Sequence, residues 1–140
     1  NFETFFGLGE QLLERIDHDF SVPATIRTAA LFTAQATVSF YQALYYVFYG
    51  KEGECYDPAT MHRRMGTLSA QLLLAADDER TENIFELANL GRWIPKATRD
   101  TNFSIAEETF YKLLERVDKI QRAIRNACEI RIERYQELSI

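Results

Sequence analysis

The stretch that decides the fold is AQATVSFYQALYYVFYG, residues 34–50, which contains no charged side chain although the whole chain has a net charge of −5. The charge-free run begins at residue 28 and is long enough to cross a bilayer. However, threonine, serine and glutamine are spread along it, and its tyrosines lie within the segment rather than in belts at both ends. We therefore expect a buried helix in a helical bundle, and no membrane span.

A helix that is apolar nearly all round must be covered on most sides. Its own bundle supplies part of that cover, and a second subunit is expected to supply the rest. Tyrosine suits such a surface because it buries the area of its ring while keeping a polar tip, and it is enriched at interfaces. The segment therefore predicts a homodimer, and an aromatic ligand pocket at the same place is the alternative. The candidate interface residues are Tyr41, Tyr45, Tyr46, Phe48 and Tyr49.

Apolar residues recur at three- and four-residue steps along the rest of the chain, which is the spacing of one side of a helix. Helix start signals are Ser21 with Pro23, Asp57 with Pro58, and a capping box from Ser104 to Glu107. Gly50 suits a helix C-terminus, and Pro95 stops another helix. The expected helices cover residues 2–20, 21–50, 57–77, 80–93 and 105–135.

No strand signal competes with these helices, because period-two alternation and hairpin dipeptides are absent from the sequence. The predicted fold class is all-α, an antiparallel up-and-down bundle of four long helices plus one shorter helix. A chain of 140 residues corresponds to about one domain, so residues 1–140 are expected to form a single bundle. The chain begins with asparagine rather than methionine, which suggests a fragment of a longer chain.

Composition limits the function classes. The net charge of −5 argues against nucleic-acid binding through overall charge, although a local basic patch remains possible. Cys55 and Cys128 have no metal-binding spacing and no signal peptide precedes them, so a cytoplasmic protein with reduced thiols is expected. His18 and His62 are the only histidines, and no phosphate-binding glycine loop is present. No metal or cofactor is expected, no catalytic residue is assigned, and the sequence favours a non-catalytic domain. A Cys–His nucleophile pair is an alternative without a flanking signature.

The connection from residue 92 to 100 combines three cations and an indole with a single acid. Guanidinium and ammonium groups hold phosphate, and an indole can stack on a base. The candidate nucleotide or RNA contacts are therefore Arg92, Trp93, Lys96 and Arg99. The alternative is that Trp93 packs back on the bundle and the cations are solvated. Basic residues of the last helix follow acids by four positions, as Arg122 follows Asp118, and this indicates a solvent face of helical ion pairs.

Three short motifs are similar to those of a known family of helical domains. The first is Gln35-Ala36-Thr37 with Tyr41 and Phe48-Tyr49-Gly50, which is similar to the second helix of that family, with Ala34 in place of its histidine. Pro58, Thr60 and His62 resemble its Pro and Thr-His motif, with one residue inserted. Ala97-Thr98-Arg99 and the segment 102–108 resemble the start of its last helix, with the arginine displaced by one position. The family that these motifs resemble is HEPN, the "higher eukaryotes and prokaryotes nucleotide-binding" helical domains, of the type that follows a nucleotidyltransferase domain in bacterial chains.

The resemblance implies a bacterial homodimer with a groove between the subunits. Many members of the family are ribonucleases with an Arg-x4-6-His motif, but neither histidine here has an arginine five to seven positions upstream. The expected function is a non-catalytic dimerising domain that contributes to nucleotide or RNA binding, as an accessory to an N-terminal nucleotidyltransferase domain. The first alternative is a purely structural dimerisation module, and the second is a ribonuclease.

Overall fold

The computed structural model describes residues 2–16, 23–51, 53, 58–69, 71–72 and 106–138. These residues form α1 (Phe2–Glu14), α2 (Pro23–Tyr49), α3 (Pro58–Met65), the short 3₁₀ helix η1 (Gly66–Leu68) and α6 (Glu107–Leu138). No strand occurs in these residues, so the prediction of an all-α protein is confirmed for them. The expected helix over residues 80–93 lies outside the described residues, as do the capping residues Ser21, Asp57 and Ser104.

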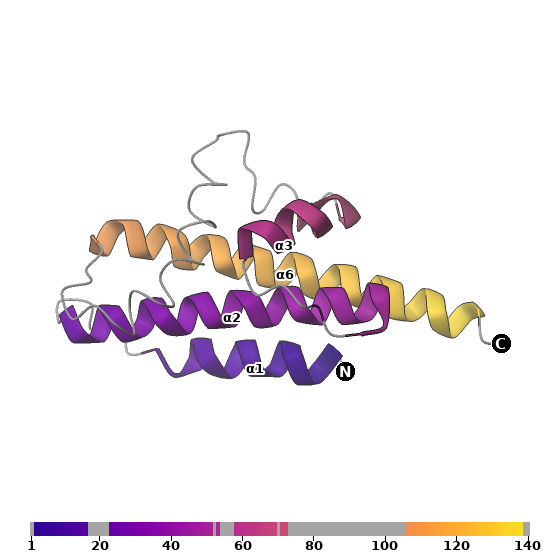
Figure 1. Ribbon diagram of the computed structural model, residues 1–140, viewed down its shortest axis with the longest axis horizontal. Coiled ribbons are helices and arrows are strands. Elements are labelled where there is room, and N and C mark those ends of the chain that lie inside the picture. The colour runs from indigo at the N-terminus through magenta and orange to yellow at the C-terminus, as the bar shows by residue number, and fades with distance from the viewer. Residues whose placement is uncertain are drawn as a thin grey trace.

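Helix α2, which contains the charge-free run, lies beside α1, α3 and α6 and is the centre of the fold (Figure 1). One side chain from each of three helices illustrates this packing: Phe6 of α1, Phe40 of α2 and Ile120 of α6 all belong to one buried cluster. Phe6 and Phe40 pack with their ring centroids 5.0 Å apart. Gly9 lets α1 approach α2 closely, because a Cβ atom at that position would lie 2.5 Å from the Phe40 ring.

The polar residues of α2 are satisfied inside the protein. The hydroxyl of Thr33 donates a hydrogen bond to the carbonyl of Ala29 at 2.7 Å, and the hydroxyl of Thr37 donates to the carbonyl of Thr33 at 2.8 Å. The Gln42 amide bonds both the N–H and the carbonyl of Gly53, at 2.8 and 3.0 Å. These bonds explain how a helix with several polar side chains is buried without a cost for unpaired groups. No helix in the described part of the chain is both long and apolar enough for a bilayer crossing.

Both predicted ends of α2 are close to the observed ones. The helix begins at Pro23 and ends at Tyr49. Gly50 follows with φ of 74°, and its N–H donates to the carbonyl of Tyr46 at 2.8 Å. This is the left-handed C-terminal cap that glycine adopts without steric cost.

The direction of the helices differs from the predicted up-and-down order. α1 is antiparallel to α2, but α6 runs in the same direction as α2 (Figure 1). Accordingly, Arg131 near the end of α6 stacks on Phe48 near the end of α2. A long stretch of chain separates the two helices, and parallel neighbours are possible only when the connection is long enough to return to the other end. The predicted antiparallel pairing is therefore wrong for α2 and α6.

The predicted long helix over residues 57–77 is also interrupted. α3 ends at Met65, η1 follows, and Ser69 is extended with φ of −148° and ψ of 124°. The Ser69 hydroxyl accepts a hydrogen bond from the N–H of Leu72 at 3.2 Å, which is the geometry of a cap on a new helix. The helical spacing of Met61, Met65 and Leu72 therefore extends over two helical segments and not over one continuous helix.

Candidate functional site

The predicted nucleotide contacts Arg92, Trp93, Lys96 and Arg99 lie outside the described residues. Their role stays a prediction. The described residues offer two other surfaces with a distinct chemistry, and both lie beside the C-terminal half of α6.

The five predicted interface residues of α2 do not share one environment. Tyr41 is completely buried within its own chain, and its hydroxyl lies 3.1 Å from Nδ1 of His62 on α3. Burial raises the pKa of the Tyr41 phenol above its ordinary range. Tyr41 therefore has no surface to offer a second subunit, which corrects the expectation for this residue.

The other four candidates keep some exposed surface. Tyr45, Tyr46 and Phe48 are partly buried, and Tyr49 is 51% exposed. The rings of Tyr45 and Tyr49 pack together with their centroids 4.6 Å apart. An interface through these four residues stays a prediction.

His62 is a packing residue inside the core. Its side chain is only 5% exposed, and Gly66 packs so closely against it that a Cβ atom there would lie 2.7 Å from Cε1 of the imidazole. An imidazole in this position cannot reach a substrate outside the core. The other histidine, His18, lies outside the described residues.

Cys128 is buried in the cluster between the helices. Burial, with a smaller contribution from the Glu129 carboxylate, raises the pKa of its thiol to about 12. A thiol that stays protonated at neutral pH is a poor nucleophile. The described residues also contain no group of three histidine, cysteine, aspartate or glutamate side chains that could hold a metal ion.

The first surface is a groove of about 320 Å³ between the end of α2, η1 and α6. We call it the basic groove, and its lining residues are Phe48, Leu68, Ser69, Asn126, Ala127, Ile130, Arg131 and Arg134. Its two charged side chains are both arginines, and one aromatic ring contributes to its wall.

Arg131 of the basic groove packs against two aromatic side chains, Phe48 and Tyr135. Its guanidinium carbon lies 5.1 Å from the centre of the Phe48 ring and 5.0 Å from that of Tyr135. Its Nε donates to the Tyr135 hydroxyl at 3.0 Å, and that hydroxyl donates to the carbonyl of Val47 at 3.4 Å. Arg134, one turn later, forms no ion pair within the part of the chain that the structure describes. Arg131, Arg134 and Tyr135 were not predicted from the sequence as site residues, although their spacing at i, i+3 and i+4 places them on one face of a helix.

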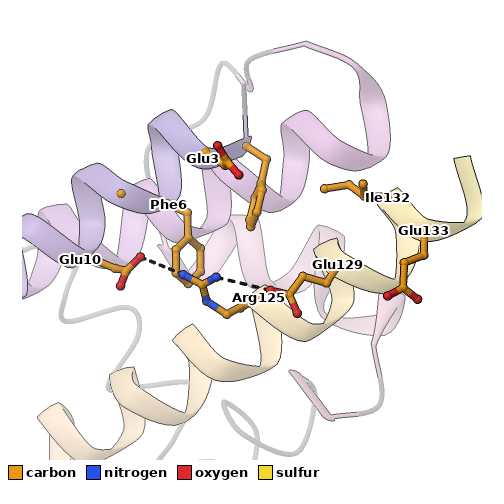
Figure 2. Close-up of a pocket in the computed structure, with 9 residues that line it drawn as sticks. Glu3, Phe6, Glu10, Arg125, Glu129, Ile132 and Glu133 are labelled. Carbon is orange, nitrogen blue, oxygen red and sulfur yellow. Dashed lines mark hydrogen bonds and ion pairs between the residues drawn. The ribbon is translucent and has the colours of Figure 1, made fainter. Parts of the chain in front are cut away.

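The second surface is a pocket of about 500 Å³ between α1 and α6, shown in Figure 2. We call it the acidic groove. Its lining residues are Phe2, Glu3, Phe6, Gly7, Glu10, Arg125, Glu129, Ile132 and Glu133. Four carboxylates face one guanidinium, so the groove has an excess of negative charge.

Arg125 crosses the acidic groove and joins α6 to α1 (Figure 2). Its Nη2 lies 2.9 Å from a carboxylate oxygen of Glu10, and its Nη1 lies 3.4 Å from one of Glu129. Its guanidinium carbon lies 4.3 Å from the centre of the Phe6 ring. The sequence predicted only ion pairs within the last helix, and the predicted pair of Asp118 with Arg122 does form there, at 2.9 Å.

Comparison of the chain with protein-family models, with curated proteins and with solved structures finds no match. A function is therefore inferred from the chemistry of the two grooves.

Proposed function

We propose that the chain is a non-catalytic, HEPN-like helical domain that dimerises and contributes to the binding of a nucleotide or RNA. It would act as an accessory to a nucleotidyltransferase domain that precedes it in a bacterial, cytoplasmic protein. The observation that carries the proposal is the basic groove, in which Arg131 and Arg134 lie beside the ring of Phe48.

This combination suits a nucleotide because the phosphate and the base of a nucleotide need different partners. Guanidinium groups bind phosphate oxygens with strong charge-assisted hydrogen bonds, and an aromatic ring offers a face on which a base can stack. The volume of about 320 Å³ fits one nucleotide better than a longer ligand held inside a cavity. The basic groove is also a local positive site on a chain with a net charge of −5, so binding would depend on this surface and not on overall charge.

The positions of two reactive groups support the non-catalytic part of the proposal. The imidazole of His62 is enclosed by Tyr41 and Gly66, and the thiol of Cys128 is buried. Neither group is available as an acid, a base or a nucleophile for a bound ligand.

Dimerisation is supported by exposed apolar side chains on the C-terminal part of α6, a helix that extends beyond the end of α2 (Figure 1). Ile130 and Tyr135 are about half exposed, and Leu138 is 84% exposed. Tyr49 on α2 is 51% exposed, and large exposed side chains of this kind are what a second copy would cover. The same observation favours the second candidate function, a purely structural dimerisation module.

Titration with ATP, GTP and a short single-stranded RNA tests the proposal and separates the two candidates. Arg134→Ala is expected to weaken binding, because it removes a cation of the basic groove and breaks no ion pair among the residues that the structure describes. Arg122→Ala is the matched control, because Arg122 lies on the same helix, is 74% exposed and does not line the groove. If all three ligands bind more weakly than about 1 mM, or if the two variants behave alike, the binding function is wrong and the structural module remains.

A further inference from the structure

The acidic groove has a chemistry that the proposed function does not use. Glu3 and Glu10 contribute two carboxylates from α1, and Glu129 and Glu133 contribute two from α6. Arg125 is the only cation among the residues that line it. A groove with this excess of negative charge repels phosphate, so a nucleotide or RNA is the wrong class of ligand for it.

Arg125 shows which kind of group this groove accommodates. Its guanidinium has an aromatic ring against its face and a carboxylate on each side, from two different helices. This is the environment in which a guanidinium is bound most favourably, because the ring attracts the cation and the carboxylates accept its hydrogen bonds. Arg125 uses the end of the groove near Glu10, and the groove continues past Phe6 toward Glu3 and Glu133 (Figure 2).

The part of the groove away from Glu10 retains negative charge. Glu133 lies one helical turn after Glu129 and forms no ion pair within the described residues. Glu3 lies across from it on α1 and belongs to the same lining. A second cation can therefore enter the groove without displacing Arg125.

An apolar pocket of about 370 Å³ adjoins this end of the groove. Its lining residues are Phe2, Glu3, Tyr46, Val47, Ile132 and Tyr135, of which Phe2, Glu3 and Ile132 also line the acidic groove. The shared residues make the two cavities neighbours. A ligand that fills both must carry a cation and, close to it, a large apolar group.

We propose that this composite site binds a segment of a partner protein in which an arginine lies next to a large apolar side chain. The arginine would enter the acidic groove beside Glu133, and the apolar side chain would fill the pocket next to Ile132. A metal ion is not favoured, because no three potential ligands in the described part of the chain are placed to share one. A polyamine would satisfy the carboxylates but would leave the apolar pocket empty. The proposal does not depend on the nucleotide or RNA function.

Titration of the isotope-labelled protein with the peptide acetyl-Leu-Arg-Leu-amide, followed by NMR, tests the proposal. We expect saturable shifts at the amides of Phe2, Glu3, Ile132 and Glu133. The same peptide with citrulline in place of arginine removes the charge and keeps the shape, and it is expected to bind at least about five-fold more weakly.

Matched variants test the site itself. Glu3→Gln combined with Glu133→Gln is expected to weaken binding of the arginine peptide about five-fold, because each exposed carboxylate contributes a modest attraction. Glu14→Gln combined with Glu115→Gln removes the same charge from the same two helices outside the groove, and it is expected to leave binding unchanged. Circular dichroism checks that both double variants are folded.

Four results would overturn the proposal. The first is equal binding of the arginine and citrulline peptides, and the second is equal behaviour of the two double variants. The third is that spermidine binds as tightly as the peptide and shifts the same amides, which would identify a polyamine. The fourth is that these amides shift when the protein alone is concentrated, which would identify a second copy of the chain as the occupant.

Discussion

The hydroxyl of Tyr41 on α2 lies 3.1 Å from Nδ1 of His62 on α3, inside the core. The rings also meet edge to face, with their centroids 6.1 Å apart. This pair connects the central helix to α3 through a buried polar contact, and buried polar groups that lose their partner are costly. The contact therefore has a structural role that can be measured.

Replacement of Tyr41 by phenylalanine keeps the ring and removes the hydroxyl. We expect a loss of about 1–2 kcal/mol in the free energy of unfolding, because Nδ1 of His62 loses this partner in a buried site. Urea denaturation followed by circular dichroism measures the loss. Tyr49→Phe is the control, because Tyr49 is exposed and its variant should match the wild type. Equal stabilities of the two variants would show that the Tyr41–His62 contact contributes nothing.

The glycines provide a second test, in which the same substitution has opposite effects. Gly66→Ala is expected to destabilise the protein by about 1–3 kcal/mol, because the new methyl group would lie 2.7 Å from Cε1 of His62. Gly7→Ala in α1 is expected to stabilise it by about 0.5–1 kcal/mol, because a Cβ atom there meets nothing within 4 Å and alanine favours a helix. Thermal unfolding of both variants checks the prediction. A Gly66→Ala variant as stable as the wild type would contradict the close packing of η1 against His62 of α3.

The fold was predictable where the signal is local. Pro23 and Gly50 delimit α2 through their own backbone preferences, which need no knowledge of the rest of the chain. The break at Ser69 was missed because Leu68 and Leu72 continue the apolar spacing across it. The direction of α6 was missed because a helix pattern is the same whichever way the helix runs.

The site was less predictable, because it depends on contacts between distant parts of the chain. Residues 28–49 of α2 carry no charge that would mark a solvent face, so the sequence did not distinguish buried Tyr41 from exposed Tyr49. The pair of Glu10 with Arg125 joins residues far apart in the sequence, and no local rule indicates such a pair. Only the short-range pair of Asp118 with Arg122 could be read from its spacing.

The raised pKa of the Cys128 thiol predicts that the stability of the protein depends on pH. Burial raises the pKa of this thiol from an ordinary value near 9 to about 12, so the folded state keeps its proton at a pH where the unfolded chain loses it. The unfolded state therefore binds fewer protons above about pH 8.5, and the free energy of unfolding falls as the pH rises from there toward 12. Urea denaturation between pH 7 and 10 measures this contribution as the difference in slope between Cys55→Ser and the double variant with Cys128→Ala. Identical slopes would mean that the pKa of the Cys128 thiol is not raised in the folded protein.

The contacts of Arg125 are expected to contribute to the stability with which α1 packs on α6. Arg125→Ala removes the pairs with Glu10 and Glu129 and the contact with the Phe6 ring, and it leaves uncompensated negative charge in the acidic groove. Because the paired side chains are partly exposed, we expect a loss of only about 1 kcal/mol in the free energy of unfolding. Arg122→Ala is the control, because its pair with Asp118 lies within one helix and is worth about 0.5 kcal/mol or less.

Salt separates the two parts of the Arg125 effect. Raising the ionic strength to about 1 M screens the ion pairs but leaves the contact with Phe6 largely in place. The difference between wild type and Arg125→Ala should therefore shrink in high salt without vanishing, as measured by urea denaturation. Hydrogen exchange should also show faster opening of α1 in the variant, because Arg125 is a direct link from α1 to the C-terminal half of α6. If α1 exchanges at the same rate in both proteins, its attachment depends on apolar packing such as that of Phe6 on Phe40, and Arg125 is a surface residue without a structural role.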